Sequence, residues 1–148
     1  MKLPRTITHD ARLAGVSKLL SRFMEEVRAP GDRLGLLLAT TAKPGMGDGG
    51  AGTFCKMLRR RHPGIVACEP RHVSWFAAEA TAMLVHHGIA SVAADPPPAT
   101  QGDALGGPAE WQYWRLDGSP RIYYRDYDAD ALNDFKQRLN TPAATGER

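Results

Sequence analysis

Apolar residues in this sequence recur with a helical period in some segments and form short continuous runs in others. The clearest helical segment starts after Asp10, which can cap it, and stops at Pro30-Gly31. Its apolar face repeats about every 3.6 residues and consists of Leu13, Val16, Leu19, Leu20, Phe23, Met24 and Val27. Three further helices are predicted, the last two capped by a serine and an aspartate: Thr53–His62, Ser74–Gly88 and Asp128–Asn140.

Short apolar runs between these helices predict strands that are buried on both faces. Such runs occupy Leu34–Ala39, Ile65–Cys68 and Ile89–Ala94, and strand character also marks Lys2–Ile7 and Trp111–Leu116. Because parallel neighbours need crossover connections, the alternation of helices and strands predicts an α/β fold with a parallel sheet.

The chain has about five predicted strands, too few for a closed barrel. A full (β/α)-barrel takes about 250 residues, and this chain has 148. The sequence therefore predicts a partial (β/α) TIM-type barrel of about five parallel strands that does not close. One domain is expected over residues 1–140, followed by a disordered tail over residues 141–148.

Composition is that of an ordinary globular chain, with 43% hydrophobic and 24% charged residues. The longest apolar runs are far shorter than the ~20 residues that cross a bilayer, so no membrane span is expected. The charged N-terminal residues are not followed by an apolar core, so no secretory signal is predicted and a cytoplasmic location is expected. Cys55 and Cys68 lack ligand spacing and are predicted to be reduced, packed thiols; no metal and no cofactor is predicted.

The net charge of +3 is mildly basic, and its densest run is Arg59-Arg60-Arg61-His62. Such a run can bind phosphates. It also fits the last turn of a helix, where cations complement the macrodipole and stay solvated. We favour the helix end, because no interleaved aromatic residues accompany the run, and we do not expect nucleic acid as a partner.

Polar and ionisable side chains follow most of the predicted strands. Because the carboxyl ends of parallel strands meet at one rim, these side chains are expected to share a crevice. The candidate catalytic carboxylates are Glu69 and Asp95. The candidate substrate-binding residues are His9, Arg71, His72, Arg115 and Tyr124. Two structural alternatives stay open: a buried Glu69–Arg71 ion pair, and a helix-capping role for His9.

A glycine-rich stretch, Gly45–Gly50, fits the G-x-G-x-x-G fingerprint of dinucleotide-binding folds, and Glu69 follows about 20 residues later. The first glycine, however, lies several residues after the apolar strand, and the helix that follows is short. Dinucleotide binding is therefore the less favoured alternative.

The segment Glu69-Pro70-Arg71-His72-Val73-Ser74-Trp75 resembles the Glu-x-Arg-His-x-Ser-Trp turn of the YecE-like family, a domain of unknown function (domain of unknown function 72). Further segments similar to that family follow in its order: Lys2–His9, Leu34–Leu38, Ala93–Asp95 and Tyr113–Gly118. The resemblance implies a (β/α)-barrel fold and a site at its rim, but no reaction.

Two departures from the family pattern fall on that rim. The family's Gln-Leu-Pro-Pro is replaced around Thr40–Lys43, and Asp117 stands where the family has a histidine. The first two strands and the last strand of the family pattern also have no counterpart, which predicts a chain truncated at both ends with open sheet edges.

Two functions are consistent with these residues. The first is a YecE-like barrel protein that binds or converts a small anionic substrate at the carboxyl-terminal rim of its strands. The second is a non-catalytic truncated remnant or a module that binds a protein partner, or, less favoured, a nucleic-acid backbone, through its open sheet edges and basic helix end. Homo-oligomer formation through the open sheet edges is a separate expectation. Whether the chain is an enzyme is not established by its sequence.

Overall fold

The computed structural model describes residues 1–41, 50–98, 106–107, 112–119, 121–124 and 126–140. Its α-helices are α1 (Ser17–Glu26), α2 (Gly50–Arg61), α3 (Ala78–His86) and α4 (Ala129–Asn140). Its strands are β1 (Leu37–Thr41), β2 (Val66–Pro70), β3 (Ala90–Ser91), β4 (Ala93–Asp95) and β5 (Trp114–Leu116). Three short helices complete these elements: the π-helix η1 (Thr6–Asp10) and the 3₁₀-helices η2 (Gly31–Arg33) and η3 (Val73–Phe76).

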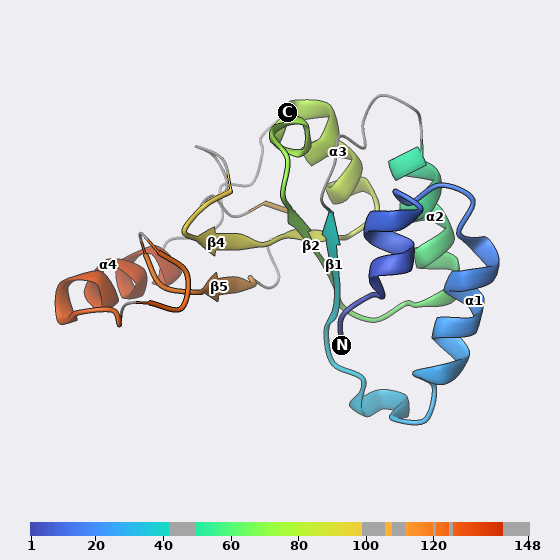
Figure 1. The fold of residues 1–148 in the computed structure, drawn as a ribbon, viewed down its shortest axis with the longest axis horizontal. Coiled ribbons are helices and arrows are strands. Elements are labelled where there is room, and N and C mark those ends of the chain that lie inside the picture. The colour runs from blue at the N-terminus through green and yellow to red at the C-terminus, as the bar shows by residue number, and fades with distance from the viewer. Residues whose placement is uncertain (42–49, 99–105, 108–111, 120, 125, 141–148) are drawn as a thin grey trace.

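All paired strands run parallel, in the orders β1-β2-β3 and β4-β5. The two sheets meet at Val92, whose N–H donates to the carbonyl of Cys68 on β2 at 2.8 Å. The next residue, Ala93, donates to the carbonyl of Tyr113 at 3.1 Å, on the side of β5. The chain from β3 to β4 therefore lies between β2 and β5, and the predicted mixed α/β fold with unclosed parallel strands is confirmed (Figure 1).

The first predicted strand, Lys2–Ile7, is wrong beyond its start. Leu3 donates to the carbonyl of Leu38 and Leu38 donates to that of Met1, each at 2.8 Å, which places a short parallel segment beside β1. The carbonyl of Pro4 then accepts the N–H groups of Ile7 and Thr8, at 3.0 and 3.2 Å, and the chain turns into η1. These local bonds end the extended segment after three residues.

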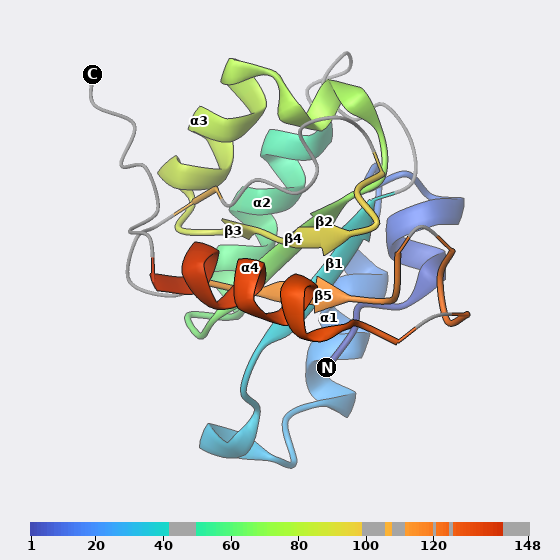
Figure 2. The ribbon, with the colours of Figure 1, turned by 90° about the vertical axis from the view of Figure 1, so that its left-hand side faces the viewer.

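Side chains of β1 and β2 alternate between two faces, as the period of a strand requires. The outer face packs against α1, α2 and α3, which lie together on one side of these strands (Figures 1 and 2). The inner face carries a small cluster of Leu38, Ala67 and Val92, with the half-buried Leu36 and Tyr113. Trp75 is buried in the outer cluster.

Helix ends follow the prediction only where a local signal determines them. The carboxylate of Asp128 accepts the N–H of Ala131 at 2.9 Å, and Gly88 adopts a φ of +60° after α3, so both predicted ends are confirmed. Asp10, in contrast, accepts a bond from Arg5 at 3.3 Å, and the first helix begins seven residues later, at Ser17. Ser74 lies inside η3 instead of capping α3, because the imidazole of His72 accepts its N–H.

The arginine run at the end of α2 connects helices, and only Arg60 is an exposed member of it. Arg59 donates to the carbonyls of Gly88 and His87 after α3, and Arg61 donates to the hydroxyl of Ser17 on α1 at 2.9 Å. The prediction of a solvated run is therefore wrong for Arg59 and Arg61, because backbone and hydroxyl oxygens of neighbouring helices lie within their reach.

Among the described residues, no helix combines the length and the apolar character that a bilayer span demands. The predicted tail at residues 141–148 and most of the glycine-rich stretch, residues 45–49, lie outside the described residues.

Candidate functional site

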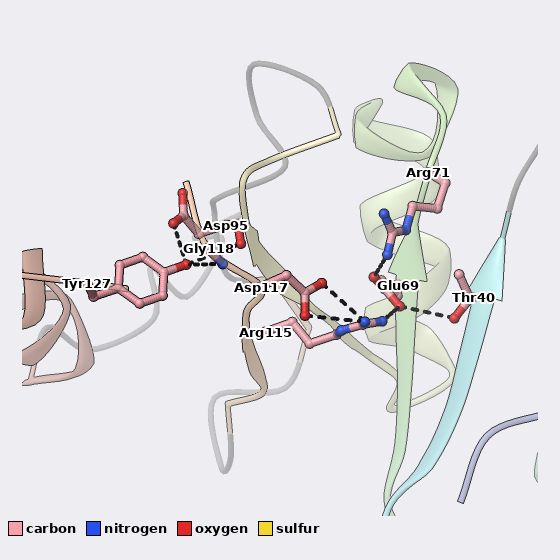
Figure 3. A network of polar contacts seen from close by, with 8 residues as sticks. All are labelled: Thr40, Glu69, Arg71, Asp95, Arg115, Asp117, Gly118 and Tyr127. Carbon is pink, nitrogen blue, oxygen red and sulfur yellow. Dashed lines mark hydrogen bonds and ion pairs between the residues drawn. The ribbon is translucent and has the colours of Figure 1, made fainter. Parts of the chain in front are cut away.

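The carboxylate of Glu69, at the carboxyl end of β2, is fully buried and accepts three hydrogen bonds (Figure 3). Its Oε2 accepts the hydroxyl of Thr40 at 3.0 Å and a guanidinium N–H of Arg115 at 2.7 Å. Its Oε1 accepts a guanidinium N–H of Arg71. The prediction that Glu69, Arg71 and Arg115 share one rim is consistent with this geometry, and so is the structural alternative of a buried Glu69–Arg71 pair.

Strand register brings these side chains together. Thr40 pairs with Glu69 across β1 and β2, and paired residues of neighbouring strands point to the same face. Arg115 pairs with Ala94 across β4 and β5, so the methyl group of Ala94 lies on the face from which the guanidinium extends. Because this methyl group is small, Arg115 can reach over the intervening strand to Glu69.

The opposite end of the Arg115 guanidinium faces Asp117, with 3.1 Å between its NH2 group and Oδ2. Burial alone would lower the pKa of Arg115, but the charges of Glu69 and then of Asp117 outweigh burial, and the pKa is raised above its ordinary value. Two carboxylates thus balance the two guanidinium groups of Arg71 and Arg115.

Asp95, the last residue of β4, belongs to an adjacent set of bonds around Tyr127 (Figure 3). The phenol of Tyr127 donates to Oδ2 of Asp95 at 2.7 Å and accepts the N–H of Gly118 at 2.9 Å. The N–H of Asp117 donates to the carbonyl of Asp95 at 2.8 Å. Burial, followed by the bond to Asp95, raises the pKa of Tyr127, so the phenol keeps its proton at neutral pH. These bonds fix the turn that carries Asp117 beside β4.

The remaining predicted residues have other partners. His9 bonds through Nδ1 to the hydroxyl of Thr8 at 2.7 Å within η1. His72 uses Nδ1 to accept the N–H of Ser74 at 3.2 Å and so caps η3. Tyr124 is 74% exposed and has the guanidinium of Arg121 over its ring, 4.3 Å from the centroid. Within the described part of the chain, none of these three side chains bonds to Glu69 or to its partners.

The sequence placed Thr40 and Asp117 at strand ends on the predicted rim, but it did not pair them with Glu69 and Arg115, and it did not connect Tyr127 with Asp95. The partners of Thr40 and Tyr127 are 29 and 32 residues away along the chain, so no local signal pairs them. The pair of Arg115 and Asp117 could have been predicted, since alternate residues of a strand point to the same face.

Two other ligand classes are a metal ion, which the sequence did not predict, and a dinucleotide, which was its less favoured alternative. In the described ranges, no group of three or more His, Cys, Asp or Glu side chains lies close enough to hold a metal ion. Of the glycine-rich stretch, only Gly50 is described, and it starts α2. The carboxylate that would bind a ribose in that alternative is Glu69, which is buried and bonded to Thr40, Arg71 and Arg115.

The sequence as a whole matches one family model, described as protein of unknown function DUF72, over residues 1–148. The chain belongs to the DUF72 family. This confirms the YecE-like resemblance carried by the Glu69–Trp75 segment. No curated protein matches this DUF72 chain in sequence.

A crystal structure of a DUF72 family protein from Thermotoga maritima is similar to this chain, with a TM-score of 0.70 and 22% sequence identity. The similarity covers 93% of this chain and 59% of the Thermotoga chain. This DUF72 chain therefore has the same fold as a part of the Thermotoga protein, and it spans less than two thirds of that protein's length.

Asp117, which stands where the family resemblance predicts a histidine, is bonded to Arg115 in this DUF72 chain. The departure from the family pattern therefore places a carboxylate beside Arg115 at the rim.

Proposed function

We propose that this DUF72 chain binds a small anionic ligand at the carboxyl ends of its strands, with Arg71 and Arg115 as the donors. The observation that carries the proposal is that one buried carboxylate, Glu69, holds both guanidinium groups in place. Positioned N–H donors on a rigid sheet are what a site needs to bind an anion without first ordering its own side chains.

Both arginines are accessible to a ligand from solvent. The side chain of Arg71 is 32% exposed and that of Arg115 is 23% exposed, whereas Glu69 beneath them is fully buried. A guanidinium has five N–H donors, and among the described residues that of Arg71 donates to Glu69 alone. Several donors are therefore left for ligand oxygens.

In this proposal Glu69 is a positioning residue. Its carboxylate lies under the two arginines and already accepts bonds from Thr40, Arg71 and Arg115, so a ligand at the rim meets the arginines first. Asp95, half-buried at the end of β4, lies closer to the surface. Catalytic roles for Glu69 and Asp95 stay predictions, and the proposal concerns binding alone.

The barrel architecture belongs to the same proposal. The fold shared with the Thermotoga protein supports the interpretation of the strands as part of a (β/α) TIM-type barrel, whose rim would carry the site. Self-association through the open sheet edges also stays a prediction.

Calorimetric titration with inorganic phosphate, sulfate and acetate tests the proposal. We expect saturable binding to the wild-type chain and at least a tenfold loss for Arg71→Gln, because bonds between charged groups contribute about 1.5–3 kcal/mol. Arg22→Gln is the matched control, since Arg22 is an exposed arginine paired with Glu26 on α1. Absence of saturable binding for every anion, or equal losses for both variants, would contradict the proposal.

A further inference from the structure

The second half of α1 extends beyond the end of α2. Arg61, the last residue of α2, donates to the hydroxyls of Ser17 and Ser21 in the first half of α1, at 2.9 and 3.1 Å. α2 therefore ends beside the middle of α1, and the turns of α1 after Ser21 continue past it (Figure 1).

A cavity of about 640 Å³ lies where α2 ends. Its wall comes from the second half of α1 with the residues that follow it, from Leu34 ahead of β1, and from the segment 62–64 ahead of β2. Because β1 and β2 are parallel and both begin here, the cavity is at the amino ends of the strands, and Glu69 and Arg71 are at the opposite end. The cavity is therefore separate from the proposed anion site at the rim.

One part of the wall is apolar. It consists of Met24, Val27 and Leu34. Val27 belongs to the hydrophobic core, and the other two side chains pack against that core. The folded chain thus supports this surface from behind, so that it is already formed before a ligand arrives.

The charged part of the wall is positive on balance. Arg28 and Arg61 contribute two positive charges, and Glu25 contributes one negative charge. Burial lowers the pKa of His62, so its imidazole adds no charge at neutral pH. Arg61 is held by its bonds to α1, whereas the guanidinium of Arg28 is exposed and has no bonded partner among the described residues. Arg28 is therefore available to pair with an anion.

His62 contributes a further polar group to the wall. Its side chain is buried, and its Nε2 has no hydrogen-bond partner within the described part of the chain. Buried polar atoms in folded proteins are almost always bonded to protein, water or ligand. The wall thus contains a polar atom that the described chain leaves unbonded.

We propose that this cavity is a second ligand site, which takes a small organic acid with an apolar body. The body lies on Met24, Val27 and Leu34, and the acid group pairs with Arg28. The positive balance of the wall favours an anion over a cation, and the apolar surface favours a hydrocarbon body over a bare inorganic ion. The volume is within the range of about 300–1,000 Å³ for small-molecule sites. The inference is independent of the proposed function, because Arg71 and Arg115 do not line this cavity.

Calorimetric titration of the full chain with phenylacetate tests the inference. We expect saturable binding that is about fivefold weaker in Arg28→Gln, the loss expected for a partly solvated ion pair. Arg22→Gln is the matched control, because Arg22 is exposed on the same helix and does not line the cavity. Met24→Trp places a larger side chain in the cavity and should abolish binding with the circular dichroism spectrum unchanged. Phenethylamine, which joins the same ring to a cation, should bind at least fivefold more weakly than phenylacetate.

The outcomes separate this inference from the proposed function. Equal phenylacetate affinities in Arg28→Gln and Arg22→Gln overturn the inference, and so does phenethylamine binding as tight as that of phenylacetate. A loss in Arg71→Gln without a loss in Arg28→Gln places the probe at the rim, which overturns the inference and leaves the proposed function standing. If the wild-type chain does not bind phenylacetate, this inference fails, whereas the proposed function fails only if inorganic phosphate, sulfate and acetate also do not bind.

Discussion

Replacement of Glu69 by glutamine should destabilise the fold strongly, although the two side chains have nearly the same shape. Glu69 is fully buried, and its carboxylate is the common acceptor for Thr40 on β1, Arg71 after β2 and Arg115 on β5. Glutamine keeps one carbonyl oxygen, and its amide group turns N–H donors toward a guanidinium that is itself a donor. At least one charge-assisted bond is therefore replaced by a contact between two donors.

The magnitude follows from the bonds that are lost. A hydrogen bond to a charged group contributes about 1.5–3 kcal/mol, and removal of one partner from a buried ion pair costs about 3–5 kcal/mol. The side chains of Arg71 and Arg115 are partly exposed and recover some hydration when the carboxylate is gone. We therefore expect the free energy of unfolding to fall by about 3 kcal/mol, at the lower end of that range. For a chain of this size, the melting temperature should fall by about 6–12 °C.

Urea and thermal unfolding, followed by circular dichroism, measure this loss. Glu26→Gln is the matched control, because it removes the same charge from an exposed helical pair with Arg22, and such pairs contribute less than about 1 kcal/mol. A loss below about 1 kcal/mol for Glu69→Gln, or equal losses for the two variants, would refute the assignment of Glu69 as the residue that joins these strands.

Three further predictions concern other parts of the molecule. Burial lowers the pKa of His62 below 6.5, so on acidification the unfolded state takes up a proton before the folded state does, and stability should fall as the pH drops below about 6.5. The urea midpoint of His62→Gln should fall less over this pH range than that of the wild-type chain. An equal fall in the wild type and in the variant would contradict this. Burial raises the pKa of Cys55 to about 12 and also that of Cys68, so an aromatic disulfide reagent at about pH 8 should react with both thiols only after unfolding. Asp128→Ala removes the bond to the N–H of Ala131 and should lower the free energy of unfolding, measured in urea, by about 1 kcal/mol; an unchanged value would contradict this.

The sequence predicted the order of helices and strands where hydrophobic runs and local signals coincide. The runs at Ile65–Cys68 and Ile89–Ala94 overlap β2, β3 and β4, and the cap at Asp128 is in place. The prediction was wrong at Lys2–Ile7, where a strand-like composition competes with bonds from the backbone N–H groups to the carbonyl of Pro4. Local composition does not show whether these N–H groups bond to a neighbouring strand or to the carbonyl of Pro4.

The sequence predicted which residues lie at the site better than it predicted which of them bond to each other. Glu69 and Arg71 are two residues apart, and their ion pair was already an alternative in the sequence. The bond from Arg115 to Glu69 joins residues 46 positions apart and depends on the register of strands that the sequence does not give. The small side chain at Ala94, which allows the contact, has a meaning only once that register is known.

Asp117 shows how one departure from a family pattern changes the physics of the rim. With this carboxylate present, the charges of Glu69 and Asp117 balance those of Arg71 and Arg115, so the proposed site would attract an anion through directed N–H groups and little through net charge. A histidine at that position would be largely neutral at pH 7 and would leave one positive charge uncompensated. Added salt screens net charge over distances of about 10 Å but weakens direct hydrogen bonds less. Anion binding by this chain should therefore depend on the geometry of its donors more than on ionic strength.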